Sequence, residues 1–207
     1  MRVVLAGFGP FPGAPFNPSA AVINALAQRR RPALANVDRI SHVFATAYAS
    51  VDRDLPKLLA AKPDAVLIVG VACRRRVLCI ETRARNALSV LYPDASGHRP
   101  AQGVIHRGAV AERRSRAPVA ALQAAARSRK ISVRLSRDAG RYLCNYAYWR
   151  ALERADDRAP LVQFVHIPAV MRKSRPRRQL RTRQTTLRDL VEALEAVLIA
   201  LIAATRR

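Results

Sequence analysis

The amino-acid sequence predicts an α/β protein, a single domain of three layers (α/β/α) around a twisted, mostly parallel central sheet. Short apolar segments rich in β-branched residues alternate along the chain with longer segments of helical periodicity. The run 65–69 is apolar at every position and ends at Gly70, as strands buried on both faces of a parallel sheet do. The 207 residues, half of them hydrophobic, suit one compact domain over 1–207 with a substantial core.

The first elements follow from local patterns. Residues 2–6 are a β-branched run, so we expect a buried first strand. The segment 17–19 (Asn-Pro-Ser) has the residue order that begins a helix. A second strand is expected over 39–46, and a helix over 50–61 with its leucines on one face.

The second half of the chain continues the alternation. The expected elements are an extended segment over 77–92, an irregular polar segment over 93–117, a helix over 118–129, a strand over 131–135, a helix over 144–154 and a strand over 161–166. Residues 171–183 form a strongly basic linker, and 186–204 an amphipathic C-terminal helix. The apolar stripe of this helix is broad, and we favour packing on the sheet over a subunit contact.

The net charge of +23 is unusual, with 37 basic against 14 acidic residues. Such a charge suits a nucleic-acid or membrane-surface partner. The basic residues are nearly all arginines and are scattered along the chain, which favours a compositional bias instead. Three cysteines without a CxxC pair indicate neither a disulfide framework nor a zinc site. Without a secretory signal or a run of ~20 apolar residues, a cytoplasmic protein without membrane contact is expected.

One cysteine lies where a glycine-containing loop runs into a predicted helix. The segment 138–145 (DAGRYLCN) places Cys144 at the beginning of this helix. The positive end of a helix dipole lowers the pKa of a thiol, and free N–H groups there can stabilise an oxyanion. Cys144 is therefore a candidate nucleophile, with an ordinary buried cysteine as the alternative.

A histidine and a glutamate complete a candidate constellation. His166 is the last residue of the apolar run 161–166. It therefore lies at the carboxyl end of a predicted strand, where the functional residues of open α/β sheets are usually found. As a base it would take the thiol proton and later protonate the leaving amine; a core histidine is the alternative. Glu81 would hold the imidazole in the required tautomer. Triad members are neighbours in space, so spacing alone does not assign these roles.

Four motifs follow one another along most of the chain. They are GFGPF at 7–11 with NPS at 17–19, GVA at 70–72 with Arg75, Glu81, Ala84 and Asn86, AGRYLCN at 139–145, and FVHIP at 164–168. In this order and spacing they resemble the motifs of pyroglutamyl peptidase type I, the pyrrolidone-carboxylate peptidase family.

The resemblance implies a cysteine peptidase that hydrolyses the amide bond after an N-terminal pyroglutamyl (5-oxoproline) residue, without metal or cofactor. Its catalytic residues would be Cys144, His166 and Glu81. The pyroglutamyl ring is an uncharged lactam, so an apolar pocket with a few backbone hydrogen bonds is expected. The residues implied to bind the substrate are Phe8, Phe11, Asn17, Val71, Tyr142 and Leu143. The partners would be N-terminally pyroglutamylated peptides and, as in many family members, further copies of the chain in a homo-oligomer.

The chain departs from the family pattern near the site. Cys73 and Arg74 replace two glycines, and Leu91 stands where the family has an arginine thought to assist the oxyanion. Arg141 replaces a small threonine, and a cation there would favour the thiolate or take the place of the missing donor.

Three hypotheses follow. We favour an active pyroglutamyl peptidase. The alternatives are a divergent homologue with another amide substrate, and a basic protein that binds nucleic acid or other anions and keeps only a vestigial triad.

Overall fold

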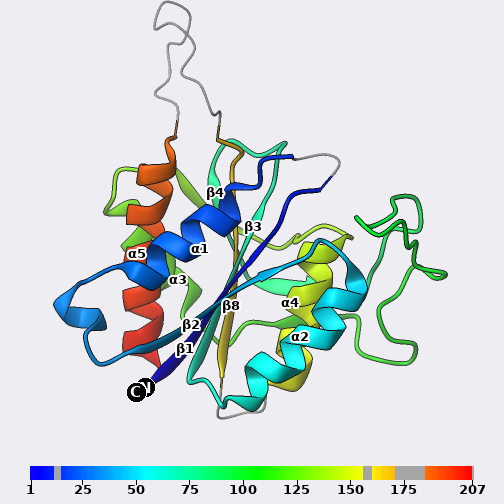
Figure 1. Ribbon diagram of the computed structural model, residues 1–207, viewed down its shortest axis with the longest axis horizontal. Coiled ribbons are helices and arrows are strands. Elements are labelled where there is room, and N and C mark those ends of the chain that lie inside the picture. Colours follow the sequence, from blue (N-terminus) through cyan, green and yellow to red (C-terminus); the bar gives the residue numbers. More distant parts are fainter. Residues whose placement is uncertain (12–14, 156–159, 171–184, 207) are drawn as a thin grey trace, which may run out of the picture.

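The computed structural model describes residues 1–11, 15–155, 160–170 and 185–206, and it has the predicted α/β fold (Figure 1). The strands are β1 (Arg2–Phe8), β2 (Asp38–Phe44), β3 (Ala65–Val71), β4 (Leu78–Glu81), β5 (Arg83–Arg85), β6 (Glu112–Arg114), β7 (Val133–Ser136) and β8 (Leu161–Ile167). The α-helices are α1 (Pro18–Gln28), α2 (Tyr48–Ala60), α3 (Val119–Arg127), α4 (Leu143–Arg154) and α5 (Leu187–Ala204), and a 3₁₀ turn spans Pro32–Leu34. The basic segment 171–183 lies outside the described residues.

The main sheet is mostly parallel, as the sequence predicts. In the described ranges it has six strands in the order β2-β1-β3-β8-β4-β7. Every neighbouring pair is parallel except β4 and β8, which run antiparallel. The central strands β1, β3 and β8 are buried almost throughout, which explains their continuous apolar sequences.

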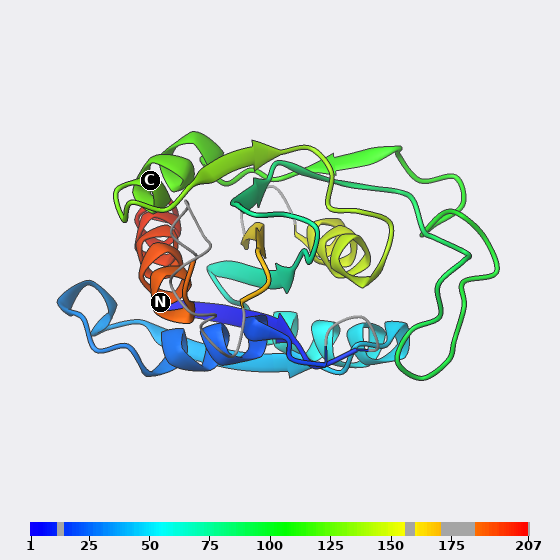
Figure 2. The same cartoon turned by 90° about the horizontal axis from the view of Figure 1, so that it is seen from above.

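Helices cover both faces of the sheet (Figure 2). Apolar residues of α1, α3 and α5 pack on one face, and those of α2 and α4 pack on the other. The inner side chains of each strand alternate between these two cores, so that Val3 and Leu5 face the first and Val4 and Ala6 the second.

The ends of two helices show why the chain folds locally as it does. Asn17 caps α1, because its Oδ1 accepts a hydrogen bond from the Ser19 N–H at 3.1 Å and Pro18 fits the first turn. Thr186 and Asp189 form a reciprocal capping box at the start of α5. The broad apolar stripe of α5 packs against α1, α3 and β3 of its own chain.

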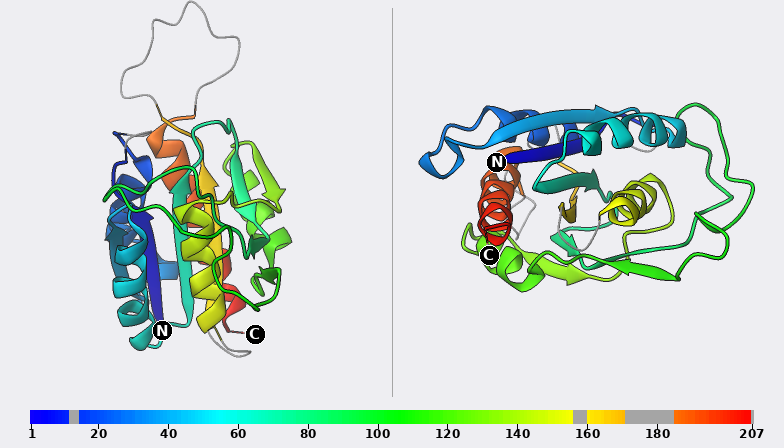
Figure 3. Two further views of the ribbon diagram at one scale, coloured as in Figure 1. Left: turned by 90° about the vertical axis from the view of Figure 1, so that its right-hand side faces the viewer. Right: turned by 90° about the horizontal axis from the view of Figure 1, so that it is seen from below.

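The segment between β5 and β6 differs from the prediction. Residues 86–92 are not a strand, and the segment expected to be irregular contains β6, which pairs with β5. Figure 3 shows the intervening chain as a long loop beside α4. Asn86 stabilises it, since Oδ1 accepts from the N–H groups of Ile105 and His106 while Nδ2 donates to the His106 carbonyl. These side-chain bonds leave no periodic signal in the sequence.

Candidate active site

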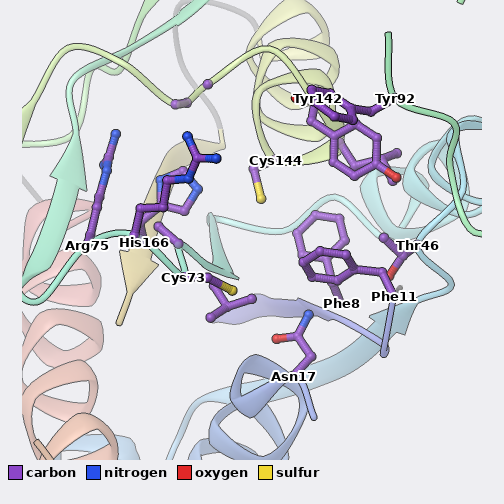
Figure 4. Close-up of a pocket in the computed structure, with 16 residues that line it drawn as sticks. Phe8, Phe11, Asn17, Thr46, Cys73, Arg75, Tyr92, Tyr142, Cys144 and His166 are labelled. Atoms are coloured by element: carbon purple, nitrogen blue, oxygen red, sulfur yellow. The ribbon is translucent and has the colours of Figure 1, made fainter. Parts of the chain in front are cut away.

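A cavity of about 630 Å³ opens at the carboxyl ends of β1, β3 and β8. Its lining consists of Phe8, Phe11, Asn17, Thr46, Val71, Ala72, Cys73, Arg74, Arg75, Tyr92, Ala139, Gly140, Tyr142, Leu143, Cys144 and His166. This set includes all six residues expected to bind substrate, together with Cys144 and His166 (Figure 4). The structure therefore brings residues from four separate motifs to one place.

Cys144 is the second residue of α4, where the first backbone N–H groups have no partner within the helix. Its sulfur lies against β3, and a Cβ placed on Gly70 would approach Sγ to 2.8 Å and the Phe164 ring to 2.8 Å. Gly70 is thus the residue whose missing side chain makes room for the thiol.

The thiol of Cys144 is neutral at rest. Burial raises its pKa to about 12, and the nearby Glu81 carboxylate acts in the same direction. The position at the helix start favours a lower pKa, but burial, the largest cause, acts in the opposite direction. A thiol with a raised pKa can act as a nucleophile only when a separate base removes its proton.

His166 lines the same cavity as Cys144. It lies in β8 and is almost fully buried, and its Nδ1 donates a hydrogen bond of 2.8 Å to Glu81 Oε1 in the neighbouring strand β4. This contact holds the proton on Nδ1 and leaves Nε2 to accept a proton. Between these two described residues, Cys144 and His166, the structure has no hydrogen bond; such bonds often tighten only when substrate is bound.

Glu81 is fully buried behind the histidine and carries a second ionic contact. Arg75 Nη1 donates to Glu81 Oε1 at 2.5 Å and to Ser136 Oγ at 3.3 Å, and its Nη2 donates to the Asp138 carbonyl. Burial alone would raise the pKa of Glu81, but the hydrogen bond from His166 and the charge of Arg75 keep it below its usual value. Glu81 is therefore ionised.

The aromatic side of the cavity is built from several elements. Phe8 packs on Phe44 and Phe164 with ring centroids 5.7 and 6.5 Å apart, and it also lines the cavity. Tyr142 Oη donates to the Pro93 carbonyl at 2.9 Å, which links α4 to the loop that carries Tyr92. The side chain of Asn17 stabilises the loop after β1, because its Nδ2 donates a hydrogen bond to the Gly9 carbonyl at 2.9 Å.

Several features of this site leave no signal in the sequence. Arg75 belongs to one of the motifs, but no pattern in the sequence predicts its ionic contact with Glu81. Thr46 and Tyr92 line the cavity without any local signal. Arg141 is exposed and is not among the lining residues, so the suggestion that it replaces the missing donor is wrong.

The fold and the site define a cysteine hydrolase: a thiol at the start of a helix shares a cavity with a histidine that a buried carboxylate holds. The family model described as pyroglutamyl peptidase matches residues 1–206, and the chain belongs to this family.

Curated relatives and solved structures agree with this assignment. Pyrrolidone-carboxylate peptidase of Gloeobacter violaceus is 31% identical, with 95% of this chain and 97% of that protein covered. The protein of the same name from Thermococcus kodakarensis is 31% identical over 88% of this chain and 90% of its own. Pyrrolidone carboxyl peptidase from Thermus thermophilus superposes with a TM-score of 0.82 at 29% identity, covering 96% of this chain and 98% of that one.

Proposed function

We propose that this protein hydrolyses the amide bond after an N-terminal pyroglutamyl residue of peptides, with Cys144 as nucleophile. The observation that carries the proposal is the hydrogen bond of 2.8 Å between His166 and Glu81 at the cavity that Cys144 lines. The alternatives of another amide substrate or of a binding protein with a vestigial triad are not favoured, because the family match extends over the whole catalytic constellation.

The reaction follows from the neutral thiol. His166 Nε2 takes the proton as Cys144 Sγ attacks the pyroglutamyl carbonyl carbon, and Glu81 stabilises the imidazolium that forms. The unpartnered N–H groups at the start of α4 stabilise the oxyanion. His166 then protonates the leaving amine, and a thioester of Cys144 remains. Water, deprotonated by the same histidine, hydrolyses this thioester to pyroglutamate and restores the thiol.

The cavity suits a lactam better than a free amino terminus. A peptide ammonium group needs a carboxylate partner when it is desolvated. Among the described residues that line the cavity none is Asp or Glu, whereas Phe8, Phe11, Tyr142 and Leu143 supply apolar surface. We assign these four, with Val71, to the contact with the pyroglutamyl ring, and Asn17 to holding the loop that carries Phe11.

The cysteines bear on the compartment. Cys73, Cys79 and Cys144 are all free in the structure, and the cytoplasm keeps thiols reduced. We therefore place this activity in the cytoplasm. No helix among the described residues is both long and apolar enough to span a bilayer.

The proposal predicts selectivity between two five-membered rings. The protein should release 7-amino-4-methylcoumarin from its pyroglutamyl amide and not from its prolyl amide, because proline carries an ammonium in place of the lactam. The fluorescence of the released coumarin measures both rates. Turnover of the prolyl amide alone, or of neither compound by folded protein, would contradict the proposal.

A second prediction concerns the space that Gly70 leaves for the thiol. Gly70→Ala would place a Cβ 2.8 Å from Cys144 Sγ and from the Phe164 ring, so the sulfur must move. We expect kcat/KM on the pyroglutamyl amide to fall about 100-fold, the size of a 1 Å misplacement. Gly103→Ala is the control, since its Cβ would meet nothing nearer than 3.8 Å and should leave turnover intact. Equal kcat/KM for the two variants would refute this account of Gly70.

A further inference from the structure

Arg74 is a cavity-lining cation with no ionic partner. It is exposed, and among the described residues it has neither a hydrogen bond nor an ion pair. Its neighbour Arg75 also lines the cavity, but its guanidinium is occupied by Glu81, Ser136 and Asp138. Of the two described arginines that line the cavity, Arg74 is therefore the one whose guanidinium is available to a ligand.

The cavity has two chemically different sides (Figure 4). Phe8, Phe11 and Tyr142 lie on one side of the Cys144 sulfur, and His166 and the loop with Cys73 and Arg75 lie on the other. An uncharged lactam is suited to the aromatic side.

This placement fixes the direction of the rest of the substrate. The scissile carbonyl must lie at Cys144 Sγ, and the leaving nitrogen must be within reach of His166, which protonates it. The residue after the scissile bond therefore leaves the cavity on the His166 side. That side carries the 73–75 loop, so this residue passes Arg74.

A guanidinium without a partner, on the path of the residue after the scissile bond, is suited to bind an anion. No Asp or Glu among the described lining residues competes for it, and a lactam offers it no charge. Guanidinium groups bind carboxylates with two parallel hydrogen bonds, which are about twice as strong as neutral ones.

We propose that Arg74 is a specificity residue that binds a carboxylate on the first residue after the scissile bond, so that pyroglutamyl dipeptides and peptides with an acidic residue at that position are the preferred substrates. The proposal rests on the pyroglutamyl peptidase activity proposed above. The shared chemistry is a carboxylate close to the leaving nitrogen, supplied by the chain end of a dipeptide or by an acidic side chain.

Three substrates test this proposal: pyroglutamyl-alanine, pyroglutamyl-alanine amide and pyroglutamyl-glutamate α-amide. In the third, the α-carboxyl group is amidated and the side-chain carboxylate is free. The first and third carry the carboxylate, from the two different sources, and the second carries none. Released pyroglutamate is measured by chromatography. For the wild type we expect kcat/KM about tenfold higher for at least one carboxylate substrate than for the neutral amide, mainly through a lower KM, a difference of ~1.4 kcal/mol. Whichever carboxylate substrate is preferred identifies the source that Arg74 recognises.

Variants of Arg74 and Arg76 distinguish carboxylate recognition by Arg74 from a general effect of charge. In Arg74→Gln the ratio of kcat/KM between the preferred acid and the neutral amide should fall to near one, and Arg74→Lys should restore part of it. Arg76→Gln removes the same charge from an exposed neighbour that does not line the cavity, and it should keep the wild-type ratio. High salt should reduce the wild-type preference, because exposed charges are screened.

The outcomes that overturn the proposal differ from those that overturn the activity. A wild-type ratio near one, or a ratio that Arg74→Gln leaves unchanged, refutes the role of Arg74 while the activity stands. An equal loss of kcat on all three substrates in Arg74→Gln assigns Arg74 to the oxyanion instead. Folded protein that cleaves none of the three contradicts the activity itself.

Discussion

Cys144→Ala should lower kcat/KM on the pyroglutamyl coumarin amide by at least about 10⁴-fold. In the proposed reaction the Cys144 sulfur forms the acyl bond, and loss of such a nucleophile leaves only the contribution of binding and of the oxyanion site. The coumarin assay measures the loss, and circular dichroism checks that the variant is folded. Cys144→Ser should be nearly as inactive, since a neutral hydroxyl is a much weaker nucleophile than a thiol.

The control for this substitution is a thiol outside the cavity. Cys79→Ala removes a buried sulfur from β4, where Sγ accepts a hydrogen bond from Arg134 at 3.2 Å and does not line the cavity. It should keep the activity. Comparable activity of Cys144→Ala and Cys79→Ala would show that Cys144 is not the nucleophile.

Glu81→Gln is expected to have the second largest effect, because it affects both chemistry and stability. The neutral amide no longer stabilises the His166 imidazolium or fixes its tautomer, and related changes lower kcat about 10⁴-fold. The variant also leaves the Arg75 charge partly buried without its anion, and breaking a buried ion pair from one side typically costs ~3–5 kcal/mol. Denaturant unfolding measures the second effect.

The control for Glu81 is a carboxylate that pairs with arginines near the surface. Glu112 in β6 forms ion pairs with Arg83 and Arg114 and is partly exposed. Glu112→Gln should change the unfolding free energy little, because its ion pairs are screened by solvent, and it should not change kcat. If the two variants lose similar activity and stability, the role given to Glu81 is wrong.

The stabilising effect of Glu81 should depend on pH. Its pKa is below that of a free glutamate, so its contribution to the free energy of unfolding is present above the unfolded-state pKa and is lost as the pH falls through the folded-state pKa. The difference in unfolding free energy between the wild type and Glu81→Gln should therefore be greatest near neutral pH and shrink in acid. A difference that is constant down to acidic pH would contradict the ionised, paired state of Glu81.

Much of the fold could be predicted because its signals are local. The run 65–69 is apolar throughout because β3 is covered on both faces. Asn17 predicts the start of α1 because its side chain caps the helix. The position of β4 could not be predicted. It lies antiparallel to β8 and parallel to β7, and this pairing depends on contacts between segments far apart in the sequence.

In the site, too, features with a local sequence signal could be predicted and contacts between distant side chains could not. Cys144 and His166 lie at a helix start and a strand end, which local patterns predict, whereas only the ordered motifs indicate Glu81. The partnership of Arg75 with Glu81 could not be seen, because six residues of separation say nothing about side-chain direction. The rise in the pKa of Cys144 could not be predicted, because the burial that causes it depends on packing between segments far apart in the sequence.

The central claim is that Cys144, activated by His166, attacks a bound pyroglutamyl group. Its most direct test is labelling with pyroglutamyl chloromethyl ketone followed by peptide mapping of all three cysteines. Cys73 is exposed, Cys144 is partly buried and Cys79 is buried, so reactivity by exposure alone would label Cys73 first. We expect the label on Cys144, with rapid incorporation that His166→Ala abolishes and that free pyroglutamate slows. Label on Cys73 with Cys144 unmodified, or incorporation that does not depend on His166, would contradict this account.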